Sequence, residues 1–125
     1  MQWMTISVLF ARGRYTYIHG QCVTVGVGGF LAHGGYNALG TTARHGLGVQ
    51  SVLGLKAVLA DGSIALVDPR RSVIRKPNGA TQVVPNTGDN DLFFALRGAG
   101  SSFAVITEFL YRVSYHWACT LLGWR

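Results

Sequence analysis

The clearest pattern along the chain is a pair of apolar, β-branched runs that meet at a two-residue turn signal. Residues 52–60 and 63–68 are rich in Val, Leu, Ile and Ala, and Asp61-Gly62 lies between them. An Asp-Gly pair tolerates the positive φ of a tight turn, so the pattern predicts an antiparallel hairpin. Residues 103–113 are rich in β-branched and aromatic side chains and predict a further strand.

The remaining segments have weaker periodicity. Residues 69–88 contain three prolines, scattered basic residues and an Asn-Gly pair, which predicts a long surface loop or an insertion. Residues 92–97 predict a short helix, because residues 89–91 offer a capping carboxylate or amide and Gly98 can end it. Residues 28–40 predict a loop that runs into a short helix, since their glycines reduce helix stability.

The composition is typical of a folded, core-rich domain. The chain has 125 residues, about one domain's length, of which 49% are hydrophobic and 13% charged. Eleven Lys and Arg against five Asp and Glu give a net charge of +6, which favours anionic partners. The aromatic side chains do not interleave with the basic ones as in a nucleic-acid platform, so nucleic acid is not an expected partner.

Residues that usually carry metal, redox or acid–base chemistry are sparse. Cys22 and Cys119 are too few for a disulfide-stapled scaffold, and the four histidines lack the short spacing of zinc ligands. The five carboxylates fall mostly in turns and caps and form no convincing catalytic pair, so no catalytic or metal-binding residue is predicted. Any reaction would have to be carried by a cofactor.

The chain also carries few signals of address or architecture. No apolar run reaches the roughly 20 residues that span a bilayer, so no membrane segment is expected. Residues 1–10 lack the charged start and the full apolar stretch of a signal peptide, which leaves the compartment open. There is no internal repeat and no low-complexity tract.

Glycine is concentrated in two segments near opposite ends of the chain, residues 26–36 and 97–107. Without a Cβ, a phosphate or a flat ring can approach the main chain closely, so both segments predict a ligand surface made of backbone. The dinucleotide fingerprint GxGxxG does not fit, because Leu31 stands in place of its last glycine. A P-loop does not fit either, since the chain has neither Gly-Lys-Ser nor Gly-Lys-Thr.

Five short blocks follow one another in the sequence: Gly20 to Phe30, Gly34-Gly35-Tyr36, His45 to Gly48, Val58 to Gly62 and Asp91 to Gly98. In this order they resemble those of the berberine-bridge-enzyme-like oxidases, FAD-linked proteins of the vanillyl-alcohol-oxidase or PCMH type. The ordered match extends over residues 20–113. The resemblance implies an α+β fold, a small antiparallel sheet with flanking short helices that forms the second half of a PCMH-type FAD-binding domain.

FAD is the cofactor and ligand that this resemblance implies. The cofactor-binding residues it points to are Cys22, Gly26, Val27, Gly28, Gly29, Ala32, Gly34, Gly35, Tyr36 and Ile106. In relatives that attach FAD twice, a cysteine at the place of Cys22 forms a thioether to the flavin ring, because a thiolate is a natural nucleophile for it. The alternative is a free cysteine that acts as a small apolar residue. Phe103, Val105 and Phe109 are interpreted as strand core.

Several positions depart from the family pattern. Val23 replaces a proline, His33 and Asn37 replace glycines, and Ala104 takes another glycine place. An added Cβ at such places could crowd the backbone at a cost of about 1 kcal/mol or more where φ is positive. Phe30 stands where some members carry a histidine beside flavin N1 and O2, and a phenyl ring cannot donate a hydrogen bond there.

The expected organisation is a partial FAD-binding domain at residues 20–113, between unmatched segments at 1–19 and 114–125. Its partner would be the missing remainder of its parent protein, an FAD-dependent oxidoreductase of a commonly secretory family. That parent would oxidise a carbohydrate, alcohol or amine by hydride transfer to flavin, which O₂ reoxidises, whereas the truncated fragment would be inactive. The alternative is a non-catalytic module that binds anions or a protein and holds no flavin.

Overall fold

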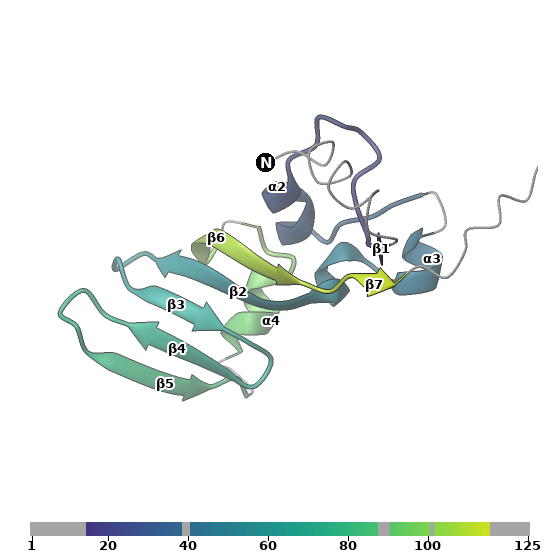
Figure 1. Ribbon diagram of the computed structural model, residues 1–125. Coiled ribbons are helices and arrows are strands. Elements are labelled where there is room, and N and C mark those ends of the chain that lie inside the picture. The colour runs from purple at the N-terminus through teal and green to yellow at the C-terminus, as the bar shows by residue number, and fades with distance from the viewer. Residues whose placement is uncertain (1–14, 39–40, 88–90, 101, 116–125) are drawn as a thin grey trace, which may run out of the picture.

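A five-stranded antiparallel sheet forms one side of the described structure (Figure 1). The computed structural model describes residues 15–38, 41–87, 91–100 and 102–115. The strands lie in the order β5-β4-β3-β2-β6. Their bounds are Val52–Leu59 for β2, Ile64–Val67 for β3, Arg71–Arg75 for β4, Thr81–Pro85 for β5 and Ala104–Tyr111 for β6.

Short helices and a small two-stranded ladder complete the fold. The helices are α2 at Val27–Ala32, α3 at Thr41–His45, the 3₁₀ turn η1 at Gly48–Ser51 and α4 at Leu92–Leu96. β1 at Tyr15–Thr16 pairs antiparallel with β7 at Ser114–Tyr115. These strands fall within the two flanking segments expected to lie outside the family match. The predicted α+β class, a small antiparallel sheet with short helices, is confirmed.

The predicted hairpin at Asp61-Gly62 is confirmed. β2 and β3 pair antiparallel from Leu55 opposite Val67 onward, and Gly62 has a φ of +79°. Asp61 accepts a 2.9 Å hydrogen bond at Oδ1 from the backbone N–H of Ser63 and another at Oδ2 from its hydroxyl. These bonds, chiefly the one from the Ser63 backbone, hold the pKa of Asp61 below its usual value. The turn is therefore fixed by local chemistry.

The expectation that residues 69–88 form an irregular loop is wrong. The segment forms a second hairpin, in which β4 and β5 pair antiparallel and Gly79 occupies the turn with a φ of +86°. Pro69 lies before β4, Pro77 lies in the turn, and Pro85 ends the edge strand β5. The three prolines therefore mark the ends and the turn of the hairpin, where a missing N–H is tolerated.

The order expected within residues 28–40 is also wrong, because the helix comes first and the loop follows. α2 begins at Val27 among the glycines and ends at Ala32. The loop after it turns through Gly35, which has a φ of +75°. The two other local predictions hold, since β6 lies within residues 103–113 and α4 lies within 92–97.

The hydrophobic core lies on one face of the sheet, between the strands and the helices α2 and α4. Its buried residues are Leu31, Val52, Leu55, Ala57, Ala65, Val67, Phe93, Leu96 and Ala104. Inward and outward side chains alternate along β3, where Ala65 and Val67 are buried while Ile64 and Leu66 are exposed. Because α2 and the start of β6 share this core, the two glycine-rich segments are brought together.

Candidate functional site

The two glycine-rich segments line one shared hollow between α2 and the beginning of β6. We call it the α2–β6 hollow, and its volume is about 290 Å³. Its lining residues are Gly28, Gly29, Ala32, His33, Gly100, Ala104, Val105, Ile106 and Phe109. A concave surface shared by segments about 70 residues apart is what a backbone-lined ligand site requires.

Backbone hydrogen bonds fix the rim of this hollow. The N–H of Gly100 donates to the carbonyl oxygen of Ala32 at 3.0 Å, which ties the turn before β6 to the end of α2. The N–H of Gly48 donates to the carbonyl oxygen of Gly35 at 2.7 Å and anchors the loop after α2. Leu31 is buried beneath these bonds, so α2 is held from the core side as well.

Some glycines of these segments are required by the protein's own packing. A methyl group at Gly35 would lie 2.7 Å from Phe30 Cε1 and 3.0 Å from Gly48 Cα, and the φ of Gly35 is +75°. A methyl group at Gly100 would overlap the His33 ring, and the φ of Gly100 is +61°. Both positions therefore need glycine whether or not a ligand is present.

Gly28 and Gly29 are different, because neither the packing nor the backbone conformation of the described residues requires a glycine at these positions. Both lie in α2 without a positive φ, and a methyl group at either would have no atom within 4 Å. Glycine in a helix is less stable than alanine, so these residues carry a cost with no internal benefit. The open space beside them belongs to the α2–β6 hollow, where a Cβ would narrow the cradle.

Four of the ten predicted cofactor-binding residues line the hollow: Gly28, Gly29, Ala32 and Ile106. The other six lie outside its lining: Cys22, Gly26, Val27, Gly34, Gly35 and Tyr36. Cys22 has an exposed free thiol in the turn before α2, where the Val25 N–H donates to its carbonyl oxygen at 3.1 Å. Tyr36 is 67% exposed, whereas Gly35 is buried beneath Phe30 and Gly48. Cys119 lies outside the described residues.

Sequence reasoning missed five lining residues: His33, Gly100, Ala104, Val105 and Phe109. Val105 and Phe109 were interpreted as strand core, yet Val105 is 65% exposed. β6 is the edge strand next to α2, so residues from both of its faces reach the hollow. An apolar run does not reveal which strand will form an edge, so the sequence pattern could not separate Val105 and Phe109 from core residues. Gly100 lies in the second glycine-rich segment, and its glycine density was the available signal.

The glycine places taken by larger residues are accommodated. His33 has a φ of −114°, so no left-handed strain arises there. Asn37 is buried and donates through Nδ2 to the carbonyl oxygen of His19 at 2.7 Å. Ala104 is buried in the core beside the sheet. Each of these three side chains therefore has a defined place in the structure.

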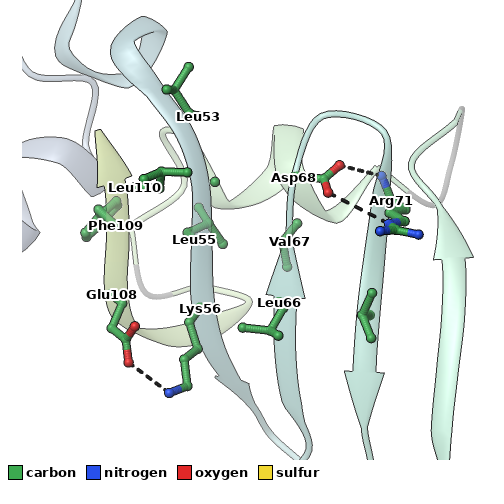
Figure 2. Close-up of a pocket in the computed structure, with 12 residues that line it drawn as sticks. Leu53, Leu55, Lys56, Leu66, Val67, Asp68, Arg71, Glu108, Phe109 and Leu110 are labelled. Carbon is green, nitrogen blue, oxygen red and sulfur yellow. Dashed lines mark hydrogen bonds and ion pairs between the residues drawn. The ribbon is translucent and has the colours of Figure 1, made fainter. Parts of the chain in front are cut away.

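A second, larger hollow lies on the opposite, open face of the sheet, with a volume of about 490 Å³ (Figure 2). Its charged groups already pair with one another, since Lys56 Nζ lies 2.8 Å from Glu108 Oε1 and Arg71 Nε lies 4.0 Å from Asp68 Oδ2. None of the predicted cofactor-binding residues lines it. The α2–β6 hollow is therefore the candidate site.

Two classes of site find no support in the described part of the chain. Within residues 15–38, 41–87, 91–100 and 102–115, no three His, Cys, Asp or Glu side chains gather to hold a metal ion. Among the same residues, no helix has the length and apolar character needed to cross a bilayer.

Several known proteins are similar to this chain in sequence and in structure. No protein-family model matches the chain. A xylooligosaccharide oxidase from Thermothelomyces thermophilus is 34% identical over 106 residues, which cover 85% of this chain and 18% of that protein. A solved glucooligosaccharide oxidase from Acremonium strictum, which carries a 6-S-cysteinyl, 8α-N1-histidyl FAD, superposes with a TM-score of 0.62. It is 31% identical, and the match covers 90% of this chain and 20% of that one.

The chain is a homologue of the berberine-bridge-enzyme-like, FAD-linked oxidases. The protein BBE-like 1 of Physcomitrella patens superposes on this chain with a TM-score of 0.63. It is 25% identical, and the match covers 91% of this chain and 21% of that protein. The resemblance seen in the sequence is thereby confirmed. This chain spans about a fifth of the length of the relatives it matches.

Proposed function

We propose that this chain binds FAD as part of the FAD-binding region of an FAD-dependent oxidoreductase, with part of the flavin nucleotide lying in the α2–β6 hollow. The observation that carries the proposal is the pair Gly28 and Gly29, whose missing side chains serve no purpose within the described chain. Both open onto the one hollow that joins the two glycine-rich segments. The homology to FAD-linked oxidases supplies the cofactor that fits there.

The lining suits a flat, largely uncharged part of the cofactor. It combines exposed backbone at Gly28 and Gly29 with apolar side chains such as Ile106 and Phe109. Such a surface can contact the flat faces and edges of an aromatic ring closely. Ligand pockets usually measure about 300–1,000 Å³, so a hollow of about 290 Å³ would hold only part of a dinucleotide.

When bound, FAD would accept a hydride from substrate and return the electrons to O₂. The chain's own contribution would be to bind the cofactor, orient it against α2 and exclude water from one side of it. The Phe30 side chain packs against the core and Gly35, and a phenyl ring provides no hydrogen-bond donor to a flavin. Another donor would have to stabilise a negative charge on the reduced ring.

We extend the proposal to the parent protein only in outline. The xylooligosaccharide and glucooligosaccharide oxidases among the relatives favour a carbohydrate over another alcohol or an amine as the substrate. Because the match covers about a fifth of those relatives, turnover would depend on protein beyond the matched part. Flavin binding is therefore the activity proposed for this chain, with the rest of its parent as the expected partner.

The direct test is flavin retention by the purified chain. The chain, expressed with excess FAD, should keep the visible flavin absorbance through gel filtration, and added FAD should raise its melting temperature. Riboflavin should also stabilise it, because the hollow is proposed to hold the uncharged part of FAD. If neither FAD nor riboflavin is retained or stabilises the chain, the proposal is wrong. Stabilisation by inorganic pyrophosphate alone would favour the anion-binding alternative.

A covalent link through Cys22 is a further part of the proposal. The thiol is free and exposed in the turn that leads into α2, and the glucooligosaccharide oxidase neighbour carries a 6-S-cysteinyl FAD. Bond formation between Sγ and the ring would release the thiol and ring protons and leave two electrons on the flavin for O₂ to remove.

The link can be tested by acid precipitation. The flavin colour should remain in the protein pellet for the wild-type chain and move to the supernatant for Cys22→Ser, while both chains bind FAD before precipitation. Mass spectrometry should show one added FAD only in the wild type. Colour released entirely from the wild-type pellet would contradict the link and would leave the binding proposal standing.

A further inference from the structure

His33 is the first residue after α2, and its ring lines the α2–β6 hollow beside Gly100. A Cβ at Gly100 would overlap Nε2 and lie 2.9 Å from Cε1, so the bare backbone at Gly100 provides the room for the imidazole. The residue was not among the predicted cofactor-binding positions. It stands where the family resemblance calls for glycine, so it distinguishes this chain.

A hydrogen bond fixes which nitrogen carries the proton. His33 Nδ1 lies 2.8 Å from the carbonyl oxygen of Gly29, one turn earlier in α2. A carbonyl oxygen only accepts, so Nδ1 must donate the hydrogen. In the neutral ring Nε2 is then unprotonated and acts as an acceptor. The α2 backbone therefore selects a tautomer with an acceptor nitrogen next to the hollow.

The rest of the lining offers no competing polar side chain among the described residues. Apart from His33 it consists of Gly28, Gly29, Ala32, Gly100, Ala104, Val105, Ile106 and Phe109. The nearby charged groups are engaged elsewhere, since Arg97 donates to the carbonyl oxygen of Val49 at 3.0 Å and stacks on Phe93. Glu108 pairs with Lys56 across β2 and β6. A ligand in this hollow would meet one side-chain hydrogen-bonding group.

We propose that His33 is a specificity-determining residue of this hollow, where Nε2 accepts a hydrogen bond from an N–H or O–H group of the bound flavin. The ring imide N–H and the ribityl hydroxyls are the flavin groups with that chemistry. This inference rests on the proposed flavin function and deepens it.

The test measures FAD and riboflavin affinity by fluorescence quenching at pH 8, using the full chain. His33→Gly should bind both ligands about three- to tenfold more weakly than the wild type, the effect of one hydrogen bond. His33→Gln restores an acceptor and should recover the affinity. His45→Gln, in the exposed α3, is the matched control and should behave as the wild type.

The outcomes separate this inference from the flavin proposal. Equal affinity of the wild type and His33→Gly would overturn the role of His33 while flavin binding stands. Weak binding by His33→Gln as well as by His33→Gly would also overturn it, because the loss would then not be that of a hydrogen-bond acceptor. A wild-type chain that binds neither ligand would overturn both. Imidazole ¹⁵N NMR of the ligand-free chain should show the proton on Nδ1, and a proton on Nε2 would contradict the tautomer.

Discussion

Replacing Gly28 and Gly29 together by alanine should make the protein more stable and a weaker flavin binder. This combination of opposite effects is unusual for a ligand-site variant and follows from two observations. Both residues lie in α2 without a positive φ, so alanine is the better helix former there. Neither added methyl group would meet an atom within 4 Å, and both residues line the α2–β6 hollow.

The magnitudes follow from those positions. A glycine in a helix interior costs roughly 0.5–1 kcal/mol relative to alanine. Because Gly28 and Gly29 lie in the first turn, the lower figure applies, and the pair should gain about 1 kcal/mol. This corresponds to a rise of roughly 4 °C in melting temperature for a domain of this size. Methyl groups forced into a close contact surface cost about 1–3 kcal/mol of binding, or roughly five- to 150-fold in the FAD dissociation constant.

The assay combines thermal unfolding without flavin and FAD titration by fluorescence quenching. Gly79→Ala is the matched control, because Gly79 lies in the far hairpin turn with a φ of +86° and open space around it. It should lose about 1 kcal/mol of stability from the left-handed conformation and keep wild-type FAD affinity. The reasoning is refuted if the double variant binds FAD as tightly as the wild type, or if it is less stable without flavin.

Two further predictions concern the scaffold. The Tyr111 hydroxyl donates to the carbonyl oxygen of Ile18 at 2.7 Å, and burial raises the Tyr111 pKa to about 12. Stability should therefore be full below the ordinary tyrosine pKa near 10 and fall between pH 10 and 12, by about 1 kcal/mol after allowance for partial exposure. Denaturant titrations should show a smaller decline for Tyr111→Phe, and equal declines would contradict the assignment. Asn86→Ala should cost about 2–3 kcal/mol, because it leaves the buried Ser72 hydroxyl and the Asp68 carbonyl oxygen without their 2.7 and 2.6 Å partners. A loss no larger than that of Asn78→Ala, in an exposed turn, would refute this account.

The sequence by itself determined the elements whose causes are local. Asp61-Gly62 specifies its turn because the Asp61 carboxylate bonds to Ser63 two residues later. The helix α4 could be predicted because an acidic residue caps it, and Asp91 Oδ1 accepts from the Phe94 N–H at 2.7 Å. The family resemblance likewise pointed to four residues of the hollow, Gly28 and Gly29 from the first block and Ala32 and Ile106 by their position in the match.

The tertiary structure decided what depends on partners distant in the chain. The strand β4 is stabilised by pairing with β3 and β5, which lie elsewhere in the sequence. The prolines and basic residues of this segment therefore predicted a loop, although the structure forms a hairpin there. α2 forms despite its glycines because burial of Leu31 in the core holds it. The hollow itself exists because the edge strand β6 and the Gly100 to Ala32 hydrogen bond bring distant segments together. Such long-range packing has no signature in any single stretch of sequence, and it alone places His33 in the site.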